Sequence, residues 1–551
     1  MLAIDADGGA ATIFNRGLIT GFVDLTDNID QFFNQAGGVF ETKLISDFGG
    51  GSDLFRNEEG STVLAATDPN ASESSAFAQL ELFENKGLIT MQDGAEDDVF
   101  QIFNTYGGTD LDFNGSGSST LAVDAFLGPP GSTSDIFIID GNVSGKTKID
   151  VNNTNPGPGA VNTVGIPVVF VNGNVKGDEF FLPQPIDAGF VSYDLFFEPT
   201  GSGVFELRSF LGPGASVPPQ VITAAQDIWF SGSDTWLDRT ADLRVLLNGG
   251  VAPLAYHPGA KYAEGAPQGP AYFTPAVWAR GSGEWIGREA TETTRAFGRT
   301  FEFNLDRDLE VMDFQMGLDL GKRGLLSEDD ILVFGPLGGF VHADLDYDAV
   351  DRAFDFSGAQ VGGYATYLRG GLFIDTLLNV HLMEIETRSM GFPHSFDATT
   401  VGLRTDSGYR FGGFNGGSFI EPLATIGVAW ADIDSFAVGG TTVSFDDDPG
   451  VRGRLGLRAG TSRAVWAATT MEPFIIGSVW GNLSGDNRAT LTSNGTTLHL
   501  TDEPGDVWGE VSAGVNFFNP SANTSVFAKL DVTFGDEVEG VGGKAGMRYN
   551  W

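Results

Sequence analysis

The sequence contains no cysteine, and its histidines all lie beyond residue 256, at His257, His342, His381, His394 and His499. Residues 1–256 therefore offer no thiol nucleophile, no Ser-His-Asp triad and no His or Cys ligand for zinc. Protease and esterase activities are disfavoured for this part of the chain, and we predict a protein that is not an enzyme and needs no cofactor or metal. A chain without cysteine also avoids premature disulfides when it crosses a membrane unfolded.

Basic residues are scarce, because 31 Lys and Arg stand against 73 Asp and Glu and give a net charge of −42. Such a charge repels a phosphate backbone and argues against nucleic acid as a partner. Acidic, Gly-rich turns at residues 49–53 and 94–98 are similar to calcium loops, but they lack the nine-residue periodicity of calcium-binding β-rolls. We interpret them as solvated charge that resists aggregation.

No run of about 18 apolar residues occurs, which excludes transmembrane helices but not transmembrane β-strands, whose individual signal is weaker. The N-terminus also lacks a basic segment followed by an apolar one, so no export signal is visible there. Because the sequence opens within a repeat, we interpret it as a truncated product. Glycine (77) and phenylalanine (45) are abundant, which is typical of a long all-β chain with many tight turns.

The last eleven residues alternate between two rows. One row is apolar, with Ala545, Met547, Tyr549 and Trp551, and the other is polar or glycine. Since every backbone N–H and C=O must be paired inside hydrocarbon, a strand with one lipid-facing row is stable only in a closed barrel, and a terminal aromatic suits the bilayer interface. The C-terminus is therefore predicted to be the closing strand of a membrane β-barrel.

Residues 1–110 carry an irregular repeat in which an aromatic or aliphatic residue precedes an asparagine. The steps between these asparagines are 19, 23, 28 and 19 residues, close to one coil of a parallel β-helix, and their positions are Asn15, Asn34, Asn57, Asn85 and Asn104. We predict a right-handed parallel β-helix in which Phe and Leu stack inside each coil while Asn and Gly form the turns.

From residue 111 to 218 the repeat gives way to short strands that are separated by Asn-Gly and Gly-Asp pairs. A solenoid needs a closing segment, because its open end exposes unpaired strand edges. We predict that residues 111–218 cap the β-helix.

The segment 219–275 differs again. Two prolines precede a stretch from Gln220 to Leu247 whose apolar residues recur near helical spacing, although Gly232 interrupts it, and Asn248 with two glycines ends it. We predict one α-helix, followed by a Gly-, Pro- and Ala-rich linker that ends at residue 275.

From residue 276 to 551, strands of period 2 recur about every 20 to 25 residues, which is long enough to cross a bilayer when tilted. The clearest alternates Met312 and Phe314 with the polar Asp313. About twelve such strands are present, an even number as bacterial barrels require. Two of them begin alike with Glu-Pro, a position where proline is tolerated because its missing donor lies outside the ladder.

The two Glu-Pro strands, residues 362–368 and the Arg-Tyr-Asn-Trp ending resemble the translocator domain of type V autotransporters. Residues 131–193 resemble the C-terminal cap of a pertactin-like passenger, and the order of solenoid, cap, helix and barrel strengthens the resemblance. It implies that the helix threads the pore of a 12-stranded antiparallel barrel, and that the protein lies in a bacterial outer membrane and displays or secretes its own passenger.

The same resemblance implies partners and residue roles. The partners are the outer-membrane lipid bilayer, the barrel assembly machinery, periplasmic chaperones and an unknown surface ligand. Tyr549 and Trp551 would form the terminal signature that the assembly machinery reads. Some family members cut themselves at an Asn of the pore helix; Asn248 is the only Asn near this helix, and its place before Gly249 fits a C-cap better.

If the alternation of the barrel strands holds, a set of polar side chains faces the pore: Arg280, Glu284, Asp313, Asp319, Asp375 and His381. A polar lumen around a plugging helix explains them, and a role in passenger release is the alternative. A second alternative, for the whole chain, is a conducting porin-like channel with an attached soluble domain. The predicted helix argues against it, since a plugged pore conducts poorly.

For the passenger we predict adhesion or surface binding, because repeated coils offer a long and uniform face. Residues 1–218 contain 8 basic and 30 acidic side chains, a net charge of −22, which disfavours strongly anionic ligands.

Overall fold

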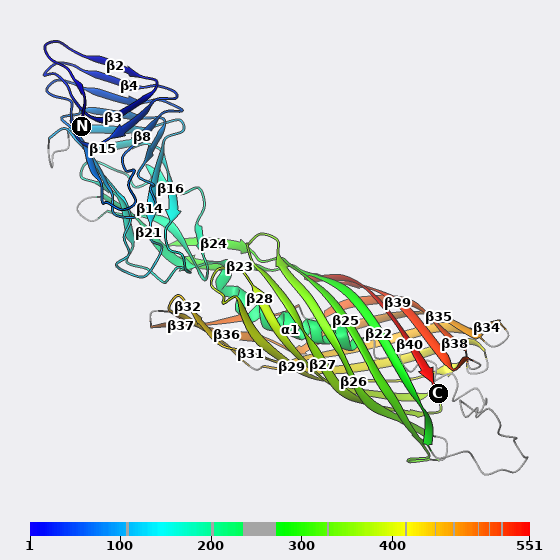
Figure 1. Cartoon of the computed structure of the whole chain (residues 1–551). Coiled ribbons are helices and arrows are strands. Elements are labelled where there is room, and N and C mark those ends of the chain that lie inside the picture. Colours follow the sequence, from blue (N-terminus) through cyan, green and yellow to red (C-terminus); the bar gives the residue numbers. More distant parts are fainter. Residues whose placement is uncertain are drawn as a thin grey trace, which may run out of the picture. The chain divides into compact units, whose positions relative to one another are not determined.

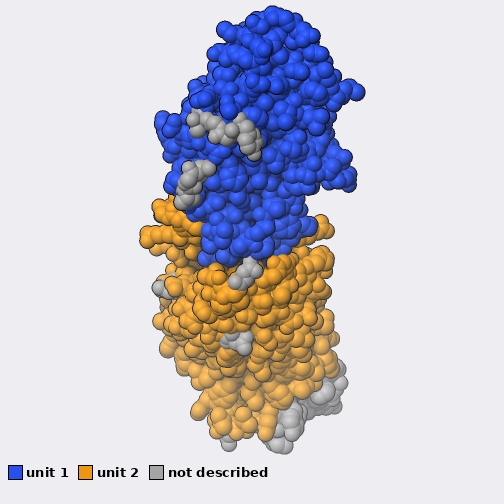
Figure 2. All heavy atoms as spheres, turned by 90° about the vertical axis from the view of Figure 1, so that its left-hand side faces the viewer, with its two compact units in different colours: residues 1–212 blue, residues 213–551 orange. Residues whose placement is uncertain are grey.

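A computed structural model of the chain describes residues 1–105, 110–199, 203–234, 272–327, 330–413, 416–446, 448–466, 469–493, 495–505, 507–519 and 522–551. The chain divides into two compact units, Met1–Gly212 and Pro213–Trp551, which Figure 2 shows in separate colours. Among the described residues, no helix has the length and apolar character needed to cross a bilayer.

Unit 1 is a parallel β-helix in which each coil adds short strands to three sheets (Figure 1). The first sheet contains β1 (Leu2–Asp5), β6 (Leu44–Asp47), β9 (Ser74–Ala78), β12 (Val99–Phe103), β15 (Ile136–Gly145) and β17 (Ile166–Val171). The second contains β2 (Thr12–Asn15), β4 (Gln31–Asn34), β7 (Leu54–Asn57), β10 (Leu82–Asn85) and β13 (Leu111–Gly115). The third contains β3 (Leu18–Asp24), β5 (Val39–Thr42), β8 (Thr62–Leu64), β11 (Leu88–Thr90), β14 (Thr120–Ala125), β16 (Thr147–Asn153) and β18 (Phe180–Phe181).

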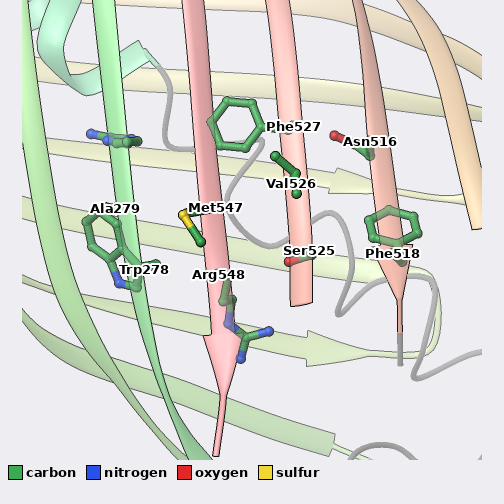
Figure 3. Close-up of a pocket in the computed structure, with 10 residues that line it drawn as sticks. Trp278, Ala279, Asn516, Phe518, Ser525, Val526, Phe527, Met547 and Arg548 are labelled. Atoms are coloured by element: carbon green, nitrogen blue, oxygen red, sulfur yellow. The ribbon is translucent and has the colours of Figure 1, made fainter. Parts of the chain in front are cut away.

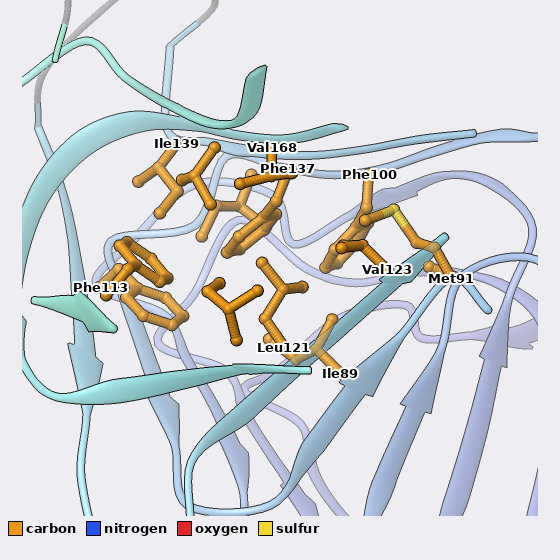
Figure 4. Close-up of a cluster of buried hydrophobic side chains, with 14 of the residues drawn as sticks. Ile89, Met91, Phe100, Phe113, Leu121, Val123, Phe137, Ile139 and Val168 are labelled. Carbon is orange, nitrogen blue, oxygen red and sulfur yellow. The ribbon is translucent and has the colours of Figure 1, made fainter. Parts of the chain in front are cut away.

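Phenylalanine fills the interior of unit 1. Phe32, Phe55, Phe83 and Phe113 occupy equivalent positions in four successive coils, and all are fully buried. The ring centroids of neighbours in this column lie 5.0, 4.9 and 5.5 Å apart. Figure 4 shows the later part of the core, where Phe113 and Phe137 lie near aliphatic side chains. Each buried ring stabilises the fold by about 2 to 3 kcal/mol, so the predicted stack contributes substantially to the core of this unit.

An asparagine ladder runs beside the phenylalanine column. Asn15, Asn34, Asn57 and Asn85 are buried, and the Nδ2 of each of the first three donates to the Oδ1 of the next asparagine at 2.8 to 2.9 Å, while the Nδ2 of Asn85 donates to the Ser119 hydroxyl at 2.8 Å. Asn104 does not join the ladder, because it follows β12 in another sheet, and the coil after Asn85 runs on until β13 pairs with β10. The prediction for Asn104 was wrong. The 19 residues from Asn85 to Asn104 equal the length of the first coil, but the coil that begins at Asn85 is longer and places Gly115 opposite Asn85.

An antiparallel hairpin closes the last coil. β20 (Val191–Glu198) pairs with β21 (Gly203–Leu211) and with β19 (Ile186–Ala188), and β21 also pairs antiparallel with β17. The buried Tyr193 hydroxyl donates to the Ala160 carbonyl oxygen at 2.7 Å and ties the hairpin to the preceding loop. The strand edge at this end of the solenoid is therefore covered.

Unit 2 opens with η1 (Pro213–Ser216) and helix α1 (Val217–Ser233), whose residues are all buried. Prolines in the first turn fit there, because their missing N–H groups would have no helical acceptor. The helix was predicted to run to Leu247; the structure ends it at Ser233, with Asp234 as C-cap, and residues 235–247 lie outside the described part of the chain.

Twelve long strands close around α1 into an antiparallel barrel (Figure 1), which confirms the predicted number. The ladder closes because the first strand pairs with both the second and the last. In order they are β22 (Tyr272–Arg288), β25 (Arg307–Arg323), β26 (Asp330–Tyr347), β27 (Ala353–Arg369), β28 (Leu372–Thr387), β29 (Ser395–Tyr409), β31 (Gly417–Ile433), β34 (Gly450–Trp466), β35 (Thr469–Ser484), β38 (Val507–Asn519), β39 (Thr524–Phe534) and β40 (Val538–Asn550).

The two ends of the barrel differ in the length of their connections. At one end the turns are short, as between β27 and β28, and include the two-residue β30 (Phe411–Gly412). At the other end, β23 (Thr291–Ala296) pairs with β24 (Arg299–Asn304), and a further sheet is built from β32 (Phe436–Val438), β33 (Thr441–Phe445), β36 (Asn487–Ser493) and β37 (Thr496–Asp502). Outer-membrane barrels have short periplasmic turns and long extracellular loops, which orients this one.

The predicted alternation of the closing strand is confirmed. On β40, Met547 and Tyr549 are 53% and 44% exposed, whereas Lys544 and Arg548 are 4% and 2% exposed. The exposed apolar row is the surface that a bilayer would cover, and the buried polar row faces the lumen.

Candidate functional site

The lumen of the barrel, occupied by α1, is the candidate functional site. Two aromatic residues near the end of the helix, Trp229 and Phe230, pack against the inner wall where the wall residues are glycine. A Cβ on Gly402 would lie 2.1 Å from Cε2 of Trp229, and a Cβ on Gly427 would lie 2.9 Å from Phe230. The Trp229 indole N–H also donates to the Asn379 carbonyl oxygen at 3.3 Å. The wall is therefore shaped to receive this helix.

Asp227 lies on the helix face that meets two arginines of the barrel wall. Its carboxylate pairs with Arg288 at 2.9 Å and also with Arg452. All three side chains are at least nine-tenths buried. Removing one partner of such a pair leaves a buried charge without compensation, which makes this contact strongly selective for an acidic residue at position 227.

Asp234, two helical turns further on, receives four cations. Its carboxylate oxygens lie 3.1 Å from Arg404, 3.4 Å from Arg454, 3.2 Å from Lys529 and 2.5 Å from Lys544. The two arginines and two lysines come from four different strands and are each 1% exposed. The end of α1 is thus fixed to the wall on several sides.

The backbone at this end of the helix is also satisfied by the wall. Arg280 donates to the Gly232 carbonyl oxygen at 2.8 Å, and Gln315 donates to the same oxygen at 3.3 Å. Positive charge at a helix C-terminus is favourable, because the exposed carbonyl groups carry the negative end of the helix dipole.

The beginning of α1 meets the long-loop end of the barrel. Thr223 donates to Asp502 of β37 at 2.5 Å and accepts from Asn487 of β36 at 2.8 Å, and Gln226 also bonds Asn487. Asp502 in turn pairs with Arg307 at 3.2 Å. The chain before α1 therefore leaves unit 2 on the side that carries the long loops.

The structure places the six polar side chains of the predicted pore-facing set as follows. Arg280, Asp313, Asp319, Asp375 and His381 are at most 4% exposed on inward rows, and Glu284 accepts a hydrogen bond from Ser231 of α1 at 2.5 Å. They fall into separate groups. Asp313 accepts from Gln360, Asn379 bonds Gln360 and His381, and Asp319 pairs with Arg548 of the last strand at 2.6 Å. Asn248, the predicted passenger-release position, lies outside the described residues.

The sequence analysis missed the partners of the two Glu-Pro motifs. Glu421 and Glu472 point inward and share Arg410 and Arg458, with N–O distances of 2.8 to 3.6 Å, and all four side chains are at most 1% exposed. The guanidinium carbons of Arg410 and Arg458 lie 3.8 and 3.9 Å from the ring centroids of Phe419 and Phe474. The shared Glu-Pro opening was the available signal, because two strands with a lumen-facing glutamate at the same level require cations between them.

The seam between the first and last strands is drawn in Figure 3. A small cavity of about 20 Å³ lies there, lined by Trp278 and Arg280 of β22, Met547 and Arg548 of β40, and Asn516 of β38. Beyond the seam, Trp551 is 54% exposed at the short-turn end, next to the exposed row of β40. The two predicted signature aromatics thus face outward.

On the outer face of the barrel, acidic side chains follow the apolar rows towards the long-loop end. Glu310 of β25 lies opposite Asp344 of β26, which lies opposite Asp355 of β27. Among the described residues, one group places three potential metal ligands within 4.8 Å of one another, and it is His342, Asp344 and Asp355 on this face. These side chains are nearly half exposed. They mark where the lipid-facing surface ends.

Two family models match the chain. Residues 277–531 match the autotransporter β-domain, and residues 79–195 match the type 1 autochaperone domain. The first match covers the barrel from β22 into β39 and ends before the closing strand β40, and the second covers the end of the β-helix and part of its cap.

Two curated relatives are similar over about a third of the chain. The BrkA autotransporter of Bordetella pertussis is 29% identical over 182 residues, which are 30% of this chain and 17% of BrkA. The uncharacterised protein YuaQ of Escherichia coli K12 is 26% identical over 212 residues, 34% of this chain and 14% of YuaQ. The aligned part is thus less than a fifth of either relative.

Solved structures of autotransporter barrels are also similar. The β-domain of the Bordetella autotransporter BrkA is 22% identical with a TM-score of 0.39, and covers 51% of this chain and 100% of its own. The transport unit of AIDA-I from Escherichia coli is 15% identical with a TM-score of 0.40, and covers 56% of this chain and 97% of its own. The closure of the barrel rests on its own strand pairings, described above.

Proposed function

Because the chain belongs to the type V autotransporters, we propose that its barrel carries the β-helical unit through the bacterial outer membrane and holds it at the cell surface. The observation that carries this proposal is the occupied lumen. Helix α1 connects the β-helical unit to the barrel, fills the pore and enters from the long-loop side. If export ends with α1 in the pore, the β-helical unit that precedes α1 in the chain lies outside the cell.

The porin-like alternative is not favoured. A conducting channel needs an open path, whereas α1 is held in this lumen by ion pairs at Asp227 and Asp234. Membrane fractionation tests the barrel assignment, which both candidate functions share. The full-length protein should stay in envelope fractions after a urea wash, and its electrophoretic mobility should change on heating, as the mobility of closed barrels does. Extraction by urea, or a mobility independent of heating, would refute the barrel assignment.

For the β-helical unit we propose binding or adhesion rather than catalysis. The support is its regular surface and its composition, since residues 1–212 contain neither His nor Cys and carry a strong net negative charge. Its ligand should not be strongly anionic. Retention of the purified protein on immobilised heparin in moderate salt would contradict this, and passage through the column is the expected result.

We further propose that the terminal aromatics address the chain to the barrel assembly machinery, with periplasmic chaperones as earlier partners. Trp551 and Tyr549 lie exposed at the end of the last strand, where an edge could be recognised by strand pairing. Deleting Trp551 should stall export and expose the chain to periplasmic proteases, whereas Trp551→Phe should be tolerated. If Trp551 is only an interfacial anchor, its deletion costs a few kcal/mol at most, and passenger display stays near normal.

A further inference from the structure

The pocket around Asp234 has the properties of a binding site for a carboxylate. Arg404, Arg454, Lys529 and Lys544 converge on one carboxylate from four strands, and all are almost completely buried. Arginine presents a planar fork that matches a carboxylate, and lysine supplies a compact charge. In such a water-poor setting these contacts are much stronger than at a surface.

The barrel wall also supplies carboxylates to this network. Asp406 pairs with Arg404 and Arg454, Glu510 lies 3.7 Å from Arg454, and Asp531 pairs with Lys529 and Lys544. Each of these wall carboxylates contacts one or two of the four cations, whereas Asp234 contacts all four. Asp234 comes from the helix and is in place only once the helix has docked.

There is space beside the helix for a small ligand. A cavity of about 70 Å³ lies next to α1 and is lined in part by Asp227, Asp234, Arg452 and Glu510, with Trp480 and Trp508 as its aromatic wall. Asp234 itself therefore borders an open volume, while Arg404, Arg454, Lys529 and Lys544 lie on its far side and do not line the cavity.

The passenger provides carboxylates in quantity. Residues 1–218 hold 30 acidic and only 8 basic side chains, and all of them precede α1 in the chain. Building on the proposed export through this barrel, we propose that the Arg404, Arg454, Lys529 and Lys544 pocket binds acidic side chains of the passenger in transit, and that Asp234 finally occupies it and ends translocation. The successive acidic residues act as exchanging ligands of one site, and Asp234 remains because the helix around it also packs.

The binding step is tested on the purified full chain with Asp234→Ala. This variant removes the carboxylate that Arg404, Arg454, Lys529 and Lys544 contact, and it introduces no larger side chain. Sodium formate should raise the temperature at which its heat-modifiable band is lost, back towards the wild-type value, more than sodium chloride does at equal ionic strength. The matched control is Gly402→Ala, which disturbs the helix by steric clash with Trp229 and should respond equally to both salts. Identical responses of Asp234→Ala to formate and chloride would overturn the carboxylate site.

The transit step is tested by coupling lumen charge to passenger charge. In cells, arrival of the passenger at the surface is timed by protease accessibility for the wild type and for Lys529→Gln with Lys544→Gln. Each lumen is combined with the native passenger and with a less acidic one, in which four changes at exposed acids reduce the net charge of residues 1–218 from −22 to −18, namely Asp7→Asn, Asp27→Asn, Glu59→Gln and Asp97→Asn. The lumen change should slow the native passenger several-fold and the less acidic passenger to a smaller extent.

Equal slowing of both passengers would overturn the transit role, because it would reflect damage to the barrel alone. The proposed function fails in a different way, namely if the native passenger never reaches the surface even with the native lumen. The two failures are therefore distinguishable.

Discussion

Asn57 makes four hydrogen bonds within the buried ladder of unit 1. Its amide accepts from Asn34 and Ser61 and donates to Asn85 and the Leu88 carbonyl oxygen, all at 2.7 to 3.0 Å. Asn57→Ala removes these and leaves buried donors and acceptors unmet, which costs about 1 to 3 kcal/mol for each such group. We expect the free energy of unfolding of unit 1 to fall by about 3 kcal/mol, measured by pulse proteolysis of the full chain in urea. Asn70→Ala, on an exposed turn, should change it by less than about 0.5 kcal/mol.

Asp53 gives unit 1 a predicted dependence on pH. Burial raises its pKa to about 7, and the Glu81 and Asp30 carboxylates nearby add to the rise. The folded state therefore holds the proton more tightly than the unfolded chain. The resulting stability is complete below the unfolded pKa of about 4 and is lost as the pH rises through 7.

The expected result is a loss of stability between about pH 4 and pH 7, with a slope of up to about 1.4 kcal/mol per pH unit for each such group. Asp53→Asn cannot ionise and its Oδ1 can still accept from the Asp30 amide, so it should flatten the slope, whereas the exposed Asp7→Asn should not. Urea unfolding of unit 1 at several pH values measures this. A slope unchanged by Asp53→Asn would contradict the assignment.

Single residues also show what the sequence could and could not provide. The Phe column was predictable, because equal positions in successive coils demand equal side chains. The asparagines were predicted to form the turns, whereas in the structure they end β2, β4, β7 and β10 and their side chains form the buried ladder. The length of each coil was not predictable, since insertions in turns cost little, and Asn104 was misplaced for that reason. The ion pairs of Asp227 and Asp234 were hidden because their partners lie between 61 and 310 residues away along the chain.

Helix α1 and the strand that carries Gly402 fit together sterically. A Cβ at position 402 would overlap the Trp229 ring, which the wall cannot avoid without displacing the helix. Gly402→Ala should therefore loosen the plug and raise the conductance of the protein in planar bilayers. Gly477→Ala is the matched control, because a Cβ there meets nothing within 4 Å, and its conductance should equal that of the wild type. Equal conductance of the two variants would mean that α1 does not seal the pore.

The barrel strands were the elements that the sequence predicted best. In a strand with one face in lipid, apolar and polar residues must alternate, and this alternation assigns each side chain to one face. The inward and outward rows of β25 and β40 therefore follow directly from their residues. The end of α1 was not predictable in the same way, because helix periodicity continues past Ser233 while the docked end is defined by the cations that surround Asp234.

Charge is organised differently in the two units of the molecule. Unit 1 carries a large negative charge, whereas the lumen of unit 2 collects Arg and Lys side chains from many strands, paired with carboxylates. These lumen cations are the groups that we propose bind the acidic side chains of the passenger in transit. The order of the two units could be predicted from the sequence. The gathering of cations inside the lumen could be recognised only in the structure.

Protease digestion of intact cells tests the central claim most directly. If the barrel spans the outer membrane with its long loops outside, externally added protease should remove residues 1–212 while the barrel, residues 272–551, stays protected in the membrane. The same treatment should leave a periplasmic marker intact. Digestion of residues 1–212 only after the outer membrane has been permeabilised would place this unit in the periplasm and contradict the account.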